Sequence, residues 1–182
     1  MGQILVHEFI TLDGVIDAPT WTFDYPFDPQ MGVAIGGVMG ASRAILLGRR
    51  TYEEFAPAWS SRPDDEPGAP FMNGTPKHVV SSTLEQADWN NSTVIGPYSA
   101  GTIQRLKDEV DGGIYVSGSG TLVRAMLADG LVDELHLFVF PLVLGGGPRL
   151  FPDGAPRQTF RTADAETYES GVVHLALEAL TT

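Results

Sequence analysis

Hydrophobic residues fall in short runs along this chain, and most runs are rich in the β-branched and aromatic residues that favour strands. The run from Leu135 to Phe140 is almost continuously apolar, which is typical of a central strand covered on both faces. Two later runs flank Ser170-Gly171, a dipeptide that predicts a β-hairpin. About eight strands are therefore expected, over Ile4–Ile10, Ala44–Leu47, Lys77–Val80, Thr93–Ile95, Ile114–Val116, Leu135–Phe140, Thr159–Thr167 and Val172–Ala179.

A different spacing of apolar residues separates these strands. Ile103, Leu106 and Val110 recur at helical intervals, so their side chains share one face. A second apolar stripe ends before Gly130, a residue that favours the end of a helix. Helices are predicted over Thr51–Ala56, Thr102–Val110 and Thr121–Asp129, with a weaker, glycine-rich one over Asp28–Met39.

Strands that alternate with helices predict a single α/β domain over residues 1–182. The expected architecture is a three-layer α/β/α sandwich. Its sheet is mixed and mostly parallel, with helices on both faces and an antiparallel hairpin at the C-terminus. Two loops are long enough to act as lids over a site: the aromatic-rich Trp21–Pro29, and Ser60–Pro76 with its proline, glycine and acidic residues.

Composition excludes several classes of function. The chain has no cysteine, which rules out disulfides, thiolate metal sites and cysteine catalysis. A formal net charge of −12 repels the phosphate backbone of nucleic acids. The N-terminus lacks a basic leader, Glu8 interrupts the only early apolar run, and no run reaches the ~20 apolar residues that span a membrane. We expect a cytoplasmic protein that binds neither nucleic acid nor membrane.

The histidines give no sign of a metal site. The chain has four of them, and their positions lack the spacing of metal ligands. Each is expected to be an ordinary strand residue, and no metal is expected. They are His7, His78, His136 and His174.

Candidate chemistry begins with Gly48-Arg49-Arg50-Thr51, where a buried strand gives way to a helix. Free backbone N–H groups at a helix start, together with two guanidinium groups, suit a phosphate. The alternative is a solvent-exposed helix start whose arginines pair with acidic residues. From the residues alone both interpretations stay open.

Three further segments also follow strands. Ser81-Ser82 is expected at the carboxyl edge of the sheet, where open α/β folds bind ligands, although a turn or helix cap would use the same hydroxyls. The segment Ser117–Leu122 has the order strand, glycine loop, helix, which brings a pyrophosphate close to backbone amides; its alternative is a tight structural turn. Gly145–Gly147 could approach a ligand or form a bulge in a long strand.

The order and spacing of these motifs resemble those of the dihydrofolate reductase superfamily. They are most similar to the branch that contains the reductase domain of RibD from bacterial riboflavin biosynthesis. The resemblance runs from Leu5 to Leu180. Its strongest segments are Thr11–Ile16, Leu47–Glu53, Val80–Ser82, Val116–Leu122, and Leu131–Leu135 leading into Leu144–Gly147.

This resemblance implies a dihydrofolate reductase-like fold and NADPH as the cofactor. The Gly-Arg-x-Thr turn and the serine pair would hold the 2′-phosphate, and the glycine turn would hold the pyrophosphate. The nicotinamide would lie near the first strand and the loop at Asp13. The branch pairs its domains, so a homodimer is implied as well. The implied cofactor-binding residues are Leu47, Gly48, Arg49, Arg50, Thr51, Ser81, Ser82, Ser117, Gly118, Ser119, Gly120, Thr121 and Leu122.

The implied activity is NADPH-dependent reduction of a small planar heterocycle of the pteridine or pyrimidine type. Asp28 and Asp13 are the candidate proton donors, because a carboxyl group near apolar residues can have a raised pKa. The alternative is that both acids only cap turns. The expected pocket is lined by Phe9, Asp13, Tyr25, Phe27, Asp28, Phe55 and Ser117.

The substrate side departs from dihydrofolate reductase itself. The carboxylate that holds the pterin ring in that family would fall at Gly32, and its threonine partner would fall at Phe138. A poor dihydrofolate reductase is therefore expected. Two alternatives to this function stay open: a riboflavin-pathway pyrimidine reductase in the full sense, and a non-catalytic NADPH-binding sensor or scaffold.

Overall fold

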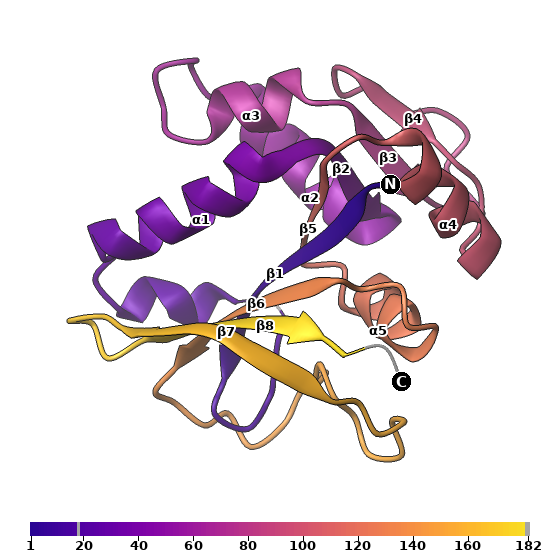
Figure 1. The fold of residues 1–182 in the computed structure, drawn as a ribbon. Helices are drawn as coiled ribbons and strands as arrows, with labels where there is room; N and C mark the ends of the chain where they lie inside the picture. The colour runs from indigo at the N-terminus through magenta and orange to yellow at the C-terminus, as the bar shows by residue number, and fades with distance from the viewer. Residues whose placement is uncertain (18, 181–182) are drawn as a thin grey trace.

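A mixed β-sheet forms the centre of the molecule (Figure 1). The computed structural model describes residues 1–17 and 19–180, so residues 18, 181 and 182 of the expected 1–182 domain lie outside the described residues. The described chain contains eight strands in the order β4-β3-β2-β5-β1-β6-β8-β7. They are β1 (Gln3–Thr11), β2 (Ser42–Gly48), β3 (Lys77–Val80), β4 (Ser92–Val94), β5 (Gly113–Ser117), β6 (Glu134–Phe140), β7 (Phe160–Thr167) and β8 (Val173–Ala179).

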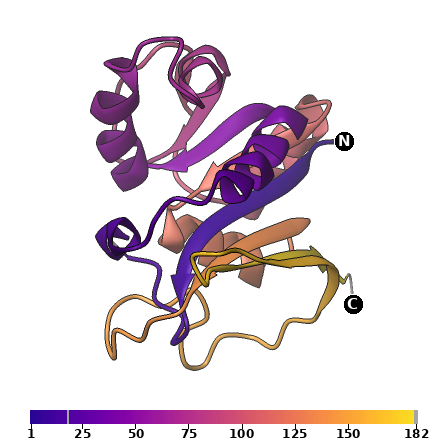
Figure 2. The ribbon, with the colours of Figure 1, turned by 90° about the vertical axis from the view of Figure 1, so that its left-hand side faces the viewer.

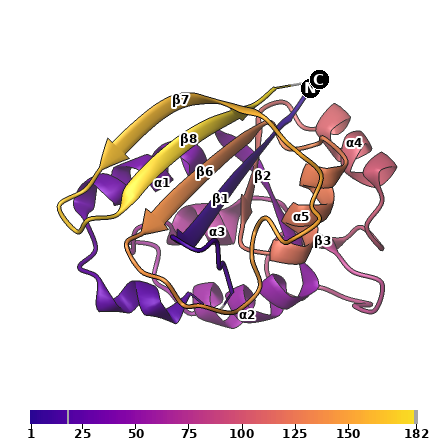
Figure 3. The ribbon, with the colours of Figure 1, turned by 90° about the horizontal axis from the view of Figure 1, so that it is seen from below.

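The direction of the strands follows the expected pattern. Every neighbouring pair from β4 across to β6 is parallel, whereas β8 is antiparallel to both β6 and β7 (Figure 3). The mixed, mostly parallel sheet with an antiparallel C-terminal hairpin is therefore confirmed.

Helices cover both faces of the sheet, which confirms the three layers (Figures 1 and 2). One face carries α1 (Pro29–Ala41), α2 (Arg49–Ser60) and α3 (Ala69–Gly74), which bury Val38, Tyr52 and Met72 against it. The other face carries α4 (Ala100–Glu109) and α5 (Gly120–Ala128), whose apolar side chains join one core cluster with Ile4 and Val6 of β1. Among the described helices, none is both long and apolar enough to cross a membrane.

Two local signals explain why the weaker predicted elements form. The glycine-rich α1 begins at a strong cap, because Oδ1 of Asp28 accepts a hydrogen bond of 2.9 Å from the N–H of Gln30 and Pro29 occupies the first turn. Helix α5 ends where Gly130 adopts a φ of 67°, and the N–H of Leu131 donates to the carbonyl of Met126 at 2.9 Å.

The two long segments predicted as loops are partly ordered into helices. The segment Ser60–Pro76 contains α3, whose Met72 is only 1% exposed beneath α2. The segment Trp21–Pro29 begins within a 3-10 helix, η1 (Thr20–Asp24), whose Trp21 packs edge-to-face on Phe140 at 5.1 Å. In both segments a buried apolar side chain anchors the backbone, which the proline and glycine content of the sequence concealed.

The bulge considered for Gly145–Gly147 is absent from the described sheet, because β6 has already ended at Phe140. The glycines lie in the following loop, and the carboxylate of Asp13 holds that loop by accepting a hydrogen bond of 2.8 Å from the N–H of Gly145.

Candidate functional site

A cleft of about 640 Å³ opens at the carboxyl edge of the sheet, where β5 ends and the parallel strand β1 continues. Strand β1 pairs with β5 only as far as His7 and Ser117, and then continues beside β6 to Thr11. The gap exposes part of β1 to the cleft. The predicted site residues that line it are Phe9, Gly48, Arg49, Arg50, Thr51, Phe55, Ser117, Gly118, Ser119, Gly120, Thr121 and Leu122.

The starts of α2 and α5 are joined by a hydrogen bond. The N–H of Gly48 donates to Oγ of Ser119 at 2.8 Å. Gly118 and Ser119 have φ values of 65° and 66°, so the chain turns through left-handed conformations before α5 begins. A Cβ added to Gly118 would lie 3.6 Å from Cγ2 of Thr51, which shows how closely the two turns approach. Two motifs separated in sequence thus form one surface.

This surface has the properties of an anion site. The first N–H groups of an α-helix have no acceptor within the helix, and the helix dipole adds partial positive charge there. At Gly120, the first residue of α5, an added Cβ would lie 2.6 Å from Cδ1 of Ile16, so a side chain there would have to displace Ile16 in the cleft wall. Two adjacent helix starts, with a glycine at the first position of α5, fit the phosphate groups of a dinucleotide.

The two arginines at the start of α2 line the cleft and are already paired. Arg49 contacts Glu53 at 3.1 Å, and Arg50 contacts Glu54 at 3.1 Å and Asp17 at 3.5 Å. Their side chains are 52% and 72% exposed. Exposed ion pairs of this kind contribute about 0–1 kcal/mol, so a phosphate can replace these carboxylates at little cost.

Three of the residues predicted to bind the cofactor lie outside the residues that line the cleft. Leu47 is fully buried within β2. Oγ of Ser81 accepts hydrogen bonds from the N–H groups of Thr83 and Leu84 at 3.1 and 2.9 Å, the turn that the sequence left as an alternative. Ser82 is exposed just beyond this turn. A cofactor contact by either serine stays a prediction.

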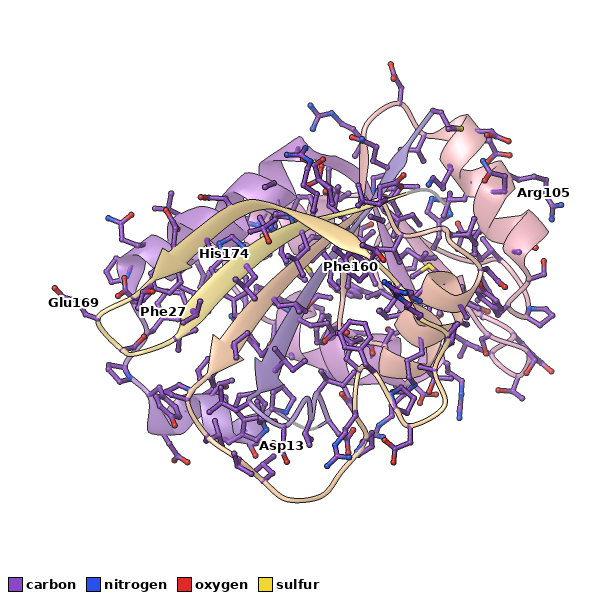
Figure 4. The ribbon with its side chains drawn as sticks, turned by 60° about the horizontal axis from the view of Figure 1, so that its bottom comes forward. Asp13, Phe27, Arg105, Phe160, Glu169 and His174 are labelled. Atoms are coloured by element: carbon purple, nitrogen blue, oxygen red, sulfur yellow. The ribbon has the colours of Figure 1, made fainter. Side chains whose placement is uncertain are left out.

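Both candidate proton donors hold loops together and also lie outside the cleft lining. Asp13, at the tip of its loop in Figure 4, accepts a hydrogen bond of 2.6 Å from the hydroxyl of Thr11. Its carboxylate also accepts hydrogen bonds from the backbone N–H groups of Leu144 and Gly145. These hydrogen bonds, above all the one from Thr11, lower the pKa of Asp13 to about 2. Asp13 is therefore ionised at neutral pH and has no proton to donate.

Asp28 joins two distant parts of the chain. Besides capping α1, its Oδ2 accepts a hydrogen bond of 3.1 Å from the N–H of Glu169 in the turn between β7 and β8. Phe27 lies beside the same turn and is 65% exposed (Figure 4). Tyr25 packs edge-to-face on Phe140 at 5.3 Å. Asp28 thus contacts the C-terminal hairpin and Tyr25 the end of β6, and neither they nor Phe27 line the cleft.

Among the cleft residues that the sequence prediction omitted are two buried ionisable residues of β1, His7 and Glu8. They are 5% and 3% exposed, and they project to opposite faces of the strand. Burial lowers the pKa of His7 to about 3, helped by the positive fields of His136 and His174. Burial also raises the pKa of Glu8 to about 8, against the opposing effect of Arg124. At neutral pH both groups are uncharged.

A sequence signal for these two residues did exist. The strand Ile4–Ile10 is buried on both faces, and two ionisable residues stand in the middle of it. Buried ionisable groups are uncommon unless paired, and those with perturbed pKa values cluster at functional sites. In contrast, Ile16 and Arg124 also line the cleft without any distinguishing pattern around them.

Comparison with known proteins identifies the family. The model of the RibD C-terminal domain matches residues 3–174, so the chain belongs to the RibD C-terminal domain family. The chain is 29% identical over 178 residues to the uncharacterized protein YyaP of Bacillus subtilis (strain 168), and the match covers 95% of this chain and 93% of YyaP.

Solved structures confirm the fold. A protein of Shewanella sp. PV-4 assigned provisionally to riboflavin biosynthesis superimposes with a TM-score of 0.80 at 19% identity, covering 98% of this chain and 99% of the other. Dihydrofolate reductase from Enterococcus faecalis, complexed with NADP(H), superimposes with a TM-score of 0.60 at 15% identity, covering 98% and 97%. The fold is therefore dihydrofolate reductase-like, as the sequence resemblance implied.

Proposed function

We propose that this protein is a cytoplasmic NADPH-dependent reductase that acts on a small planar heterocycle of the pteridine or pyrimidine type. One observation carries the proposal: a single cleft joins two adjacent helix starts, which fit phosphate groups, to a strand that presents aromatic and buried ionisable side chains. Membership of the RibD C-terminal domain family supports a reductase.

The phosphate end of the ligand would lie along the two turns. Arg49, Arg50 and Thr51 would hold the 2′-phosphate, because guanidinium groups form charge-assisted hydrogen bonds with phosphate oxygens. The amides from Gly118 to Leu122 would hold the pyrophosphate. When bound, the reduced nicotinamide supplies a hydride, and the protein's contribution is to orient the reactants and exclude water.

The other end of the cleft suits a flat ligand rich in hydrogen-bond acceptors. Phe9 and Phe55 line it with aromatic rings. Nδ1 of His7 lies 2.9 Å from the hydroxyl of Tyr115. Burial raises the pKa of Tyr115, so the phenol keeps its proton and can donate a hydrogen bond to Nδ1. In that arrangement neutral His7 carries its hydrogen on Nε2. Nε2 has no partner in the described chain, and a carbonyl or ring nitrogen of a heterocycle would supply one.

The proposal is tested by titrating the protein with NADPH and NADH, following energy transfer from tryptophan to the reduced ring. NADPH should bind more tightly, and equal affinity would contradict the assigned 2′-phosphate site. A panel of oxidised pteridines and pyrimidines is then added while NADPH absorbance is monitored. Tight NADPH binding without consumption by any compound would favour the sensor or scaffold alternative, and no binding would overturn the proposal.

A further inference from the structure

Glu8 is a buried carboxyl group in the wall of the cleft and has an unsatisfied oxygen. Its side chain is 3% exposed, and Oε1 has no hydrogen-bond partner in the described chain. An unpaired buried polar atom costs free energy, so native structures keep few of them. Since Glu8 also lines the cleft, a bound ligand can supply the missing partner.

The position of Glu8 indicates which part of a ligand it meets. Side chains alternate along β1, so Glu8 shares the α5 face with Val6 and Ile10, whereas His7 and Phe9 project to the opposite face. On the α5 face the cleft continues into Gly120 and Arg124 of α5. These residues follow directly from the glycine turn that is assigned above to the pyrophosphate. Glu8 therefore lies on the side of the cleft assigned to the dinucleotide, where we expect it to meet the nicotinamide end rather than the substrate.

The surroundings of Glu8 keep its carboxyl group protonated at neutral pH. Burial raises its pKa to about 8, and the positive charge of Arg124 on α5 is the main opposing influence. Burial, and the charge of Glu8 once that group ionises, raise the pKa of Tyr115 on β5, so its phenol also stays protonated. A protonated carboxyl group has one O–H donor and one carbonyl acceptor. The other titratable groups that line the cleft are His7, Asp17, Arg49, Arg50, Glu54 and Tyr98.

We propose that the Glu8 carboxyl group binds the carboxamide of the nicotinamide ring, donating to its carbonyl oxygen and accepting from its NH₂ group. This inference rests on the proposed function. A carboxylic acid and a primary carboxamide present matching donor and acceptor pairs, so two hydrogen bonds form and the buried oxygen of Glu8 is satisfied. An ionised carboxylate would lose the first of these bonds and leave the ligand carbonyl unpaired.

A ligand comparison tests this pairing without any turnover. The probes are NADPH and its reduced 3-acetylpyridine analogue, in which a methyl group replaces the NH₂ group. The unmutated protein should bind NADPH about tenfold more tightly at pH 7, because the analogue cannot donate to Glu8. Glu8→Ala should lose this preference. Glu8→Gln should keep it, because an amide also has one donor group and one acceptor. The control, Glu85→Gln in an exposed loop, should behave as the unmutated protein.

A pH series gives an independent readout that does not depend on the alanine variant. The dissociation constant of NADPH should rise above about pH 8 in the unmutated protein, as Glu8 ionises, and should stay flat from pH 7 to 9.5 in Glu8→Gln. Burial lowers the pKa of Lys77 to about 8 as well. Lys77 lies outside the cleft lining and is present in both proteins, so it cannot account for a difference between their binding profiles.

The outcomes separate this inference from the proposed function. If NADPH binds but the preference and the pH profile are the same with and without Glu8, the carboxamide contact is wrong while the reductase assignment stands. If the unmutated protein binds no NADPH at all, the proposed function fails and the contact fails with it.

Discussion

The backbone N–H of Gly48, at the end of β2, donates a 2.8 Å hydrogen bond to the hydroxyl of Ser119, in the turn after β5. The two residues are 71 positions apart in sequence. This contact holds the starts of α2 and α5 side by side, so the two turns form one extended surface. Disturbing either partner should therefore affect dinucleotide binding more than it affects the fold.

Gly48→Ala should weaken NADPH binding. An added Cβ would lie 3.3 Å from Oγ of Ser119, closer than most real contacts, so the two turns must move apart. We expect the dissociation constant of NADPH to rise about tenfold, equivalent to about 1.4 kcal/mol. Gly36→Ala in α1 is the matched control, because nothing lies within 4 Å of its added Cβ. The control should leave binding unchanged and raise the free energy of unfolding by about 0.5–1 kcal/mol.

Arg49→Ala and Arg50→Ala should each weaken NADPH binding tenfold or more (about 1.4 kcal/mol) and leave NADH binding nearly unchanged. A charge-assisted hydrogen bond to the 2′-phosphate contributes a few kcal/mol at most, and NADH lacks that group. Arg105→Ala is the control, since Arg105 is an exposed residue on the outside of α4 (Figure 4) and does not line the cleft. An equal loss of affinity for both cofactors would show that the arginines serve another part of the ligand.

Stability should fall as the pH rises from 6.5 to 8, and Glu8→Gln should remove this fall. In the unfolded chain Glu8 ionises near its ordinary value of 4.5, whereas in the folded protein it holds its proton up to about pH 8. The folded state therefore binds more protons than the unfolded state in this window. Each rise of one pH unit then lowers the free energy of unfolding by up to about 1.4 kcal/mol. Urea denaturation at pH 6.5 and 8 measures the effect.

His7 sets the lower pH limit of the range in which stability should fall. Its pKa is lowered from 6.5 to about 3, so the unfolded chain binds more protons between these values and stability rises with pH there. Below pH 6.5 the contributions of His7 and Glu8 oppose each other. Glu85→Gln should follow the unmutated protein throughout, and a flat profile of the unmutated protein from pH 6.5 to 8 would contradict an elevated pKa for Glu8.

Most of the sheet was predictable because its signals are local. The strand β3 (Lys77–Val80) has the predicted bounds, and β5 extends only one residue beyond the prediction at each end. Helix α3 (Ala69–Gly74) was not predictable, since its six residues include proline and glycine and its stability comes from Met72 packing beneath α2. Such a tertiary contact leaves no periodic pattern in the sequence.

The candidate site also has parts that could be predicted from the sequence and parts that could not. The turns at Gly48 and Gly118 follow buried strands, so their place at the carboxyl edge could be read from the sequence. The exposure of β1 to the cleft could not, because it depends on β5 ending while β1 continues. The long-range contacts of Asp13 and Asp28 were equally hidden, because Gly145 and Glu169 lie more than 130 residues away.

We propose that the protein forms a homodimer. The outer strand β7 (Phe160–Thr167) is exposed along almost its whole length, and a second copy would cover this free edge. The family resemblance also implies pairing. Sedimentation equilibrium at micromolar concentration should give about twice the chain mass of 19.6 kDa. A mass equal to a single chain would contradict the proposal.

Dihydrofolate should be a poor substrate. Its reduction needs a proton at a ring nitrogen and an anionic group against the amidine-like edge of the ring. The position expected to supply this carboxylate is Gly32, and α1 contains no acidic residue. Phe138, at the position of the threonine partner, is fully buried and stacks on His174 at 4.4 Å, so it offers no hydrogen bond to a carboxylate.

Asp28 does not replace the missing carboxylate. It precedes Gly32 by one helical turn, roughly 6 Å along the axis, and its two oxygens already accept from the N–H groups of Gln30 and Glu169. We therefore expect turnover of dihydrofolate far below the typical enzyme value of about 10 per second, and weak methotrexate binding, in a preparation that binds NADPH. Turnover near that value together with tight methotrexate binding would contradict this prediction. Because Asp28 is the nearest carboxylate to Gly32 in the sequence, that result would make it the proton donor and require the turn at Glu169 to release it.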